Sequence, residues 1–174
     1  MIAFRHCDSR FPFLWEGAKQ PPARWHDRGQ GPAHYFADTS NGAWAEFLRH
    51  EAIRDPDDLA TVQRAMWAVD VPDEPSARPQ LTSDATTGDA TSYAACRAEA
   101  KRLRDRGARR LEVPSAALLP GGAAGQVVSG GLVDTTARNG RVLVLFGPRP
   151  DLVGWQVVSE GRPSERLLAL VRHL

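Results

Sequence analysis

The segment Arg141–Phe146, with the sequence RVLVLF, restricts the fold more than any other part of the chain. Its last five residues are all apolar, and two of them are β-branched valines. Continuous apolar runs of this length are typical of strands that are buried on both faces. The sequence therefore predicts a buried strand, and with it a sheet, at this position.

The first half of the chain predicts three regular elements after an irregular start. Residues 1–32 are dense in proline, glycine and charge, and we expect an ordered, irregular segment folded onto the core. Residues 33–37 (AHYFA) predict a short strand. The polar side chains at 38–41 can cap a helix over residues 42–53, where apolar residues recur at helical spacing. Residues 66–71 (MWAVDV) predict a further strand that ends at a proline.

The second half of the chain predicts a long loop, a basic helix and further strands. Residues 73–89 are rich in proline, serine, threonine and aspartate and predict a surface loop, the most mobile part of the chain. Thr91 or Ser92 can cap a helix that runs to about Arg106, where Gly107 suits the C′ position. The remaining predictions are a strand at 111–113, a flexible Gly-rich loop at 120–131, and a terminal hairpin with arms at 155–159 and 165–172, the second arm being a helix in the alternative interpretation.

The predicted elements define a fold class and a domain count. Strands outnumber helices and do not alternate with them regularly, which indicates an α+β fold with a mixed or mainly antiparallel sheet and a few flanking helices. A chain of 174 residues with 42% hydrophobic and 25% charged residues has the size and composition of one globular domain. We find no internal repeat and no linker, so a single domain over residues 1–174 is expected.

Composition argues against several classes of function. The formal net charge of +1 lacks the basic excess that tight nucleic-acid binding usually requires, so no direct contact with nucleic acid is expected. Cys7 and Cys96 are far apart in sequence and suit a reduced cytosolic protein. The start of the chain carries no apolar signal segment, and no stretch approaches the roughly 18 apolar residues of a membrane helix. The histidines and cysteines show no metal-ligand spacing, so we expect a cytoplasmic protein without a metal.

Four side chains are candidates for a site, and each also has a purely structural interpretation. Arg24 can be a surface arginine stacked on a neighbouring tryptophan. Tyr35 in a short strand can pack at the edge of the core, and Ser115 can end a strand as a turn residue. Glu46 lies one turn before Arg49, so it can be half of a solvated ion pair on a helix. Taken one at a time, these side chains favour the structural interpretation.

Their order and spacing change this balance, because residues 22–50 resemble the signature region of RES-domain proteins. The arginine element of that family matches Arg24 and the tryptophan after it. Its short strand matches residues 35–37 (YFA), and its Ala-x-Ala-Glu helix start matches residues 43–46 (AWAE). Its serine after a strand matches residues 113–116 (VPSA). The resemblance covers nearly the whole chain in order, although the first half carries most of the motif.

The resemblance implies an ADP-ribosyltransferase-like fold and an enzyme that cleaves the nicotinamide–ribose bond of NAD⁺ by hydrolysis or phosphorolysis. NAD⁺ is then the substrate, and no cofactor is expected. The residue types suit this chemistry, because the Arg24 guanidinium can bind pyrophosphate oxygens in pairs. The Glu46 carboxylate can stabilise an oxocarbenium-like ribose, and the Tyr35 ring can stack on nicotinamide. Ser115 can position an amide or a ribose hydroxyl.

The resemblance also implies a biological role and a partner. RES-domain proteins act as toxins of type II toxin–antitoxin systems, and the usual partner is an Xre-like antitoxin whose tail can occupy the toxin's cleft. Contact with DNA is then made by the antitoxin, and the resemblance leaves undecided whether the toxin forms a homodimer within a larger complex. The basic helix at 92–106 is either a solvated face or a docking surface for an acidic partner.

Two other functions remain compatible with the sequence. The same cleft could transfer ADP-ribose from NAD⁺ to a protein side chain, which would make the chain a protein ADP-ribosyltransferase. The chain could also be a degenerate RES-like module that binds without catalysis. Release of nicotinamide without a macromolecular acceptor separates NAD⁺ destruction from both alternatives.

Overall fold

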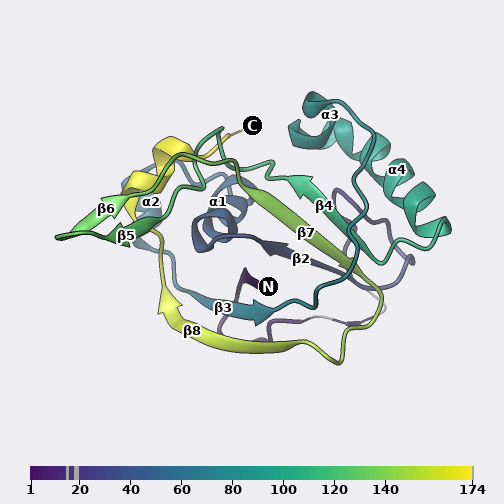
Figure 1. The fold of residues 1–174 in the computed structure, drawn as a ribbon, viewed down its shortest axis with the longest axis horizontal. Coiled ribbons are helices and arrows are strands. Elements are labelled where there is room, and N and C mark those ends of the chain that lie inside the picture. The colour runs from purple at the N-terminus through teal and green to yellow at the C-terminus, as the bar shows by residue number, and fades with distance from the viewer. Residues whose placement is uncertain (15, 18–19, 174) are drawn as a thin grey trace.

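The fold is an antiparallel sheet with helices packed around it (Figure 1). The computed structural model describes residues 1–14, 16–17 and 20–173. Within these residues the six-stranded sheet has the order β4-β7-β2-β1-β3-β8. Its strands are β1 (Ile2–Cys7), β2 (Ala33–Ala37), β3 (Arg64–Asp70), β4 (Arg110–Pro114), β7 (Arg141–Phe146) and β8 (Val153–Gly161). A separate hairpin consists of β5 (Gln126–Val128) and β6 (Leu132–Asp134).

β7 confirms the prediction made from the RVLVLF segment. It covers Arg141–Phe146 and pairs antiparallel with β2 on one side and β4 on the other. Residues 142–146 are all buried, so both faces of the strand are covered. The α+β class and the antiparallel sheet are confirmed as well.

β1 shows that the prediction of an irregular segment over residues 1–32 is wrong at its start. Residues 2–7 form an inner strand of the sheet that pairs with β3 over its whole length. The strand has the sequence IAFRHC, in which the adjacent polar residues Arg5 and His6 obscure the alternation typical of a strand. Both side chains line a cavity, which explains why an inner strand tolerates them.

The sheet is split between its two central strands. β1 and β2 are paired only at Phe4, in the middle of β1, and Ala37, at the end of β2. β2 nevertheless pairs with β7 along all five of its residues, and β1 with β3 along all six. The sheet therefore divides into the halves β4-β7-β2 and β1-β3-β8, which separate from each other beyond this single pair.

α1 (Ser40–His50) confirms the helix predicted after the second strand. The Thr39 hydroxyl caps it by accepting a hydrogen bond from the Gly42 backbone N–H at 3.0 Å. Its apolar face is buried in one core cluster with α2 (Pro56–Ala60), and includes Trp44. The helix ends before the predicted residue 53, because Ala52 adopts a left-handed backbone conformation with φ of 54°.

α4 (Tyr93–Asp105) confirms the predicted basic helix. Gly107 has a φ of 90°, the left-handed conformation expected just after a helix end. A short 3₁₀ turn, η1 (Ala90–Ser92), leads into the helix, and Ser92 is its N-cap residue. Figure 1 shows α4 alongside β4 and β7, at the opposite edge of the sheet from β8.

The predicted surface loop at 73–89 contains structure that the sequence did not indicate. Residues Ser83–Thr87 form the short helix α3, capped by the Thr82 hydroxyl. Ala77 also joins β4, since its N–H donates to Arg110 O at 2.9 Å and its carbonyl accepts from Glu112 N at 3.0 Å. The prediction of an irregular loop is therefore wrong over these stretches.

The predictions for the last third of the chain need two corrections. The expected Gly-rich loop contains β5, because residues 126–128 pair with residues 132–134. The terminal hairpin is also wrong, since β8 pairs with β3 and not with the segment after it. That segment is the 3₁₀ helix η2 (Glu165–Leu170), which agrees with the helical alternative and buries Leu167 against α1. Among the described residues, no helix has the length and apolar character needed to span a membrane.

Candidate functional site

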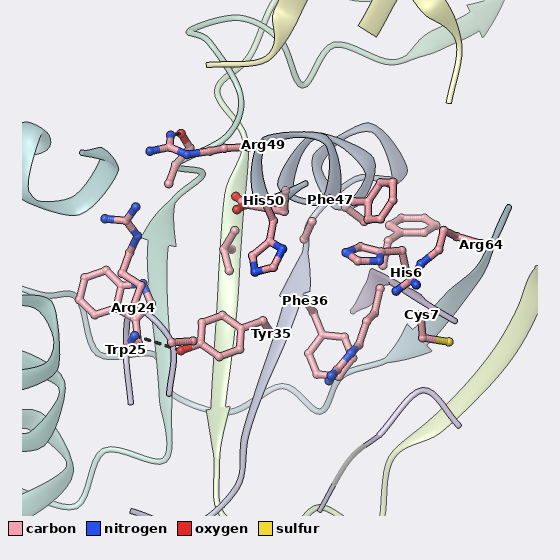
Figure 2. A pocket seen from close by; sticks show the side chains of 18 of the residues that line it. His6, Cys7, Arg24, Trp25, Tyr35, Phe36, Phe47, Arg49, His50 and Arg64 are labelled. Carbon is pink, nitrogen blue, oxygen red and sulfur yellow. Dashed lines mark hydrogen bonds between the residues drawn. The ribbon is translucent and has the colours of Figure 1, made fainter. Parts of the chain in front are cut away.

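A cavity of about 1090 Å³ opens where the two halves of the sheet separate. Residues of β1, β2, β3, β4 and α1 line it, together with the segment before β2 and the first residue of α4. Figure 2 shows Arg24 and Tyr35 at one end of this space, His6 and Arg64 at the other, and α1 along one side. Ligand pockets generally measure about 300–1,000 Å³, so this cavity can hold a dinucleotide.

We name the two ends of the cavity by their residues. The Glu46 end comprises the polar and charged side chains around α1 and the segment before β2, namely Arg24, Tyr35, Glu46 and Arg49. The β1 end comprises Arg5, His6 and Arg64. The two ends share one cavity but differ in how their polar groups are paired.

Glu46 has a carboxylate fixed by a neighbouring strand end. Its Oε1 atom accepts a hydrogen bond from Ser115 Oγ at 2.9 Å. The same hydroxyl accepts from Ala117 N at 3.2 Å and Leu118 N at 3.1 Å, so its own hydrogen is left for the carboxylate. Ser115 is itself only 5% exposed. Ser115 therefore acts as a supporting residue that orients the Glu46 carboxylate.

Burial controls the protonation of Glu46. It raises the pKa of this carboxyl above the ordinary glutamate value, because an ionised group loses hydration in the cavity wall. The Ser115 hydrogen bond and the Arg49 charge act in the opposite direction, but their effect on the pKa is smaller. Glu46 thus combines an elevated pKa, a defined orientation and access to the cavity, a combination typical of catalytic carboxylates.

Tyr35 is held with its ring on the cavity wall. Its hydroxyl accepts from the Trp25 backbone N–H at 3.0 Å and lies 3.0 Å from His26 Nδ1. His26 Nε2 lies 2.9 Å from the Pro21 carbonyl oxygen, which can only accept, so Nε2 carries the hydrogen and Nδ1 accepts from the tyrosine. Burial also raises the pKa of Tyr35, so the phenol stays neutral. Its hydroxyl is fully engaged, and its ring is left to contact a ligand.

Arg24 lies at the Glu46 end but is held by the segment around α3. Its guanidinium donates to Gly88 O at 2.7 Å and to Ser92 Oγ at 2.9 Å. It also stacks over the Tyr93 ring, 4.5 Å from the centroid. The surface interpretation of Arg24 is wrong, because the side chain is only 8% exposed.

Arg49 is a site residue that the sequence interpretation missed. The pairing of Glu46 with Arg49 as a solvated surface pair is wrong, since Arg49 is 8% exposed and lines the cavity. Its guanidinium donates to the carbonyl oxygens of Ala116, Thr87 and Gly88. The sequence feature that indicates its burial is its position among the apolar residues of α1, on the buried side of the helix.

The β1 end holds three basic side chains with unused hydrogen-bonding atoms. Within the described residues, Arg5 Nη1, His6 Nδ1 and Arg64 Nε are buried and have no hydrogen-bond partner. Burial and the nearby arginines lower the pKa of His6 to about 3, so its ring is neutral at physiological pH. The ring packs edge-on against Phe47 at 5.1 Å, and Arg64 lies over the same phenyl ring at 5.2 Å. Buried donors without partners are suited to the oxygens of a polar ligand.

The structure thus brings three of the four predicted site residues to one cavity. Arg24, Tyr35 and Glu46 line it, and Ser115 reaches it through its hydrogen bond to Glu46. Whether these side chains bind a substrate stays a prediction. In the part of the chain that the structure describes, no group of three or more histidine, cysteine, aspartate or glutamate side chains could hold a metal ion.

Comparisons with known proteins assign the family. The model of the RES domain matches residues 2–163, and the chain therefore belongs to the RES-domain family. This confirms the resemblance derived from residues 22–50. The fold is also similar to a chain in the crystal structure of the M.tuberculosis MbcT-MbcA toxin-antitoxin complex. The TM-score is 0.64 with 18% sequence identity, over 97% of this chain and 86% of that chain. The search of curated proteins found no match.

Proposed function

We propose that the protein is the toxin of a toxin–antitoxin pair and destroys NAD⁺ by cleaving its nicotinamide–ribose bond. The observation that carries this proposal is the buried carboxylate of Glu46, oriented by Ser115 on the wall of a cavity that also presents aromatic and arginine side chains. Membership of the RES-domain family supports the same conclusion.

The proposed reaction breaks one bond and forms one bond at C1′ of the ribose. The bond from C1′ to the nicotinamide nitrogen breaks, and its electron pair leaves with nicotinamide, which departs as a neutral molecule. The ribose acquires oxocarbenium character, which the negative charge of Glu46 stabilises. Water or inorganic phosphate then bonds to C1′, giving ADP-ribose or ADP-ribose with a phosphate on that same carbon. A proton is released to solvent when water is the acceptor.

The remaining residues position the dinucleotide. The ring of Tyr35, a residue of β2, offers a flat face in the cavity on which nicotinamide can stack. Arg24 at one end and Arg5 at the other supply guanidinium donors for phosphate oxygens. In this arrangement the bond to be broken lies at the Glu46 end beside Arg24, and the distal part of the dinucleotide extends towards β1.

The proposed partner is an Xre-like antitoxin that covers the cavity and blocks the substrate. The solved neighbour is a toxin-antitoxin complex, which supports an antitoxin as the partner. Contact with DNA would belong to the antitoxin, and both proteins would act in the cytoplasm. Copurification of the toxin with the antitoxin encoded beside it tests this part of the proposal.

Incubation of the purified protein with NAD⁺ tests the reaction directly. We expect nicotinamide to appear without any macromolecular acceptor, and chromatography of the second product distinguishes hydrolysis from phosphorolysis when phosphate is present or absent. Glu46→Gln should lower nicotinamide release by about 10³-fold or more, because it removes the charge that stabilises the transition state. The exposed Glu160→Gln is the matched control and should retain activity. A wild-type protein that releases nicotinamide only with a protein acceptor, or not at all, would contradict the proposal.

A further inference from the structure

Arg24 and Arg49 form a pair of buried cations without an anionic partner. Each is 8% exposed, and both line the Glu46 end of the cavity. Among the residues that the structure describes, no carboxylate lies within ion-pair distance of either guanidinium. Buried charges are normally paired, because removal from water is costly unless a counter-charge is near. Two adjacent unpaired arginines therefore indicate a place for an anion.

The two guanidinium groups converge on a single oxygen atom. Arg24 Nη2 donates to Gly88 O at 2.7 Å, and Arg49 Nη2 donates to the same atom at 2.6 Å. Burial lowers the pKa of Arg49 most, and the charge of Arg24 lowers it further, while the Glu46 carboxylate beyond ion-pair distance raises it but does not cancel these effects. The spacing of the two side chains thus already allows both to bind one acceptor.

The acceptor that they share is the end of a short helix. Gly88 is the C-cap residue of α3, and Arg49 also donates to the preceding carbonyl of Thr87 at 3.1 Å. The last carbonyl groups of a helix lack partners within it and carry partial negative charge. This end of α3 supplies weak compensation for two full positive charges. An anion would compensate the two charges more strongly than these carbonyl groups do.

We propose that Arg49 and Arg24 together form a phosphate-binding site, in which a phosphoryl oxygen takes the place of Gly88 O. Guanidinium groups bind phosphate oxygens through paired, charge-assisted hydrogen bonds that are stronger than bonds to a carbonyl. Arg49 follows Glu46 by three residues on α1, so a phosphate bound there lies on the same wall as the carboxylate. The proposal deepens the proposed function, since the phosphate is either that of the dinucleotide or free inorganic phosphate.

The competing role is a structural one, in which the two arginines only fasten α3 to α1. Both roles predict that loss of Arg49 lowers thermal stability. Only the binding role predicts that Arg49 changes the response of the protein to phosphate. Binding measurements therefore separate the two roles, and a loss of stability alone does not.

Calorimetric titration of the full chain with inorganic phosphate and, separately, with ADP tests the site. Arg49→Gln should weaken binding of at least one of these probes by about tenfold or more, as expected for loss of charge-assisted hydrogen bonds. Arg49→Lys keeps the charge and should restore part of the affinity. Arg78→Gln removes an arginine from an exposed ion pair with Glu112 and should leave both affinities unchanged.

The two probes identify the source of the phosphate. Weaker binding of phosphate alone assigns the site to the free acceptor, and weaker binding of ADP alone assigns it to the pyrophosphate of the dinucleotide. Unchanged affinities in Arg49→Gln, or a wild-type protein that binds neither probe at millimolar concentration, would overturn the proposal. These titrations need no turnover, so an enzyme that releases no nicotinamide ends the proposed function while the phosphate site is still tested.

Discussion

The two ends of the cavity differ in how completely their polar groups are satisfied. At the Glu46 end, the carboxylate is bound by Ser115, and the Tyr35 hydroxyl is bound by Trp25 and His26. At the β1 end, buried nitrogen atoms of Arg5 and other basic side chains lack partners among the described residues. Preorganised groups suit the bond-breaking step, since they need no rearrangement during the reaction. Donors without a partner favour binding, because a ligand oxygen that reached them would form a hydrogen bond that the protein leaves unmade.

This comparison makes the β1 end the place where substitution should affect substrate binding most. Arg5→Met keeps an unbranched side chain but removes the guanidinium, which lies over the Phe36 ring at 5.8 Å. We expect the affinity for NAD⁺ to fall by about 10–100-fold, the range for loss of hydrogen bonds to a charged group. Titration of the variant with NAD⁺ measures the effect. The exposed Arg166→Met serves as the control, and an equal loss of affinity in both variants would contradict the assignment.

Ser115→Ala should affect the reaction more than binding. The variant keeps the Glu46 carboxylate but removes the hydroxyl that donates to it, so we expect the rate constant for nicotinamide release to fall by about tenfold. It should also lose about 1–3 kcal/mol of stability, because the N–H groups of Ala117 and Leu118 lose their acceptor. Single-turnover kinetics with Ser159→Ala as the exposed control test this prediction. A changed affinity for NAD⁺ with an unchanged rate constant would assign Ser115 to binding.

The pH dependence of the reaction follows from the ionised form of Glu46. Because burial raises the pKa of this carboxyl, activity should fall as the pH drops through a midpoint above the ordinary glutamate value of 4.5. In Ser115→Ala the midpoint should move further upward, since the hydrogen bond that lowers the pKa is lost. Rates of nicotinamide release between pH 4 and 9 measure both midpoints. A midpoint in Ser115→Ala below that of the wild type would break the link between the two residues.

His6 should affect the pH dependence of stability and not the reaction itself. Its pKa is lowered to about 3 from an ordinary value of 6.5, so the unfolded chain binds a proton that the folded chain excludes. The stability contributed by this difference is present above pH 6.5 and is lost as the pH falls towards 3. His6→Leu removes this loss and the unpartnered Nδ1, so its unfolding free energy should depend less on pH between 6.5 and 4. Urea unfolding at several pH values tests this, and parallel curves for both proteins would contradict it.

The sequence predicted the parts of the fold that follow simple periodicity. β7 and α1 were found because their apolar residues follow one regular pattern each. β1 was missed because Arg5 and His6 occupy inner positions of the sheet, where the cavity and not an apolar core surrounds them. The polar side chains that line the cavity therefore obscured the pattern of the strand that borders it.

The order of the family motifs predicted the residues of the candidate site but not the contacts between them. The family motif selected Arg24, Tyr35 and Glu46, which share one cavity. The hydrogen bond between Ser115 and Glu46 joins residues 69 positions apart, so only the folded chain reveals that the serine supports the carboxylate. The spacing of Arg49 from Glu46 also fits an exposed ion pair, and only its burial in the folded chain distinguishes a cavity residue from a surface one.

The central claim is that Glu46 takes part in breaking the bond and not in holding the dinucleotide. Measuring NAD⁺ affinity and nicotinamide release in the same preparation of Glu46→Gln tests it most directly. We expect an affinity within a few-fold of the wild type, together with a loss of turnover of about 10³-fold or more. Retained turnover in this variant, or a loss explained entirely by weaker NAD⁺ binding, would contradict it.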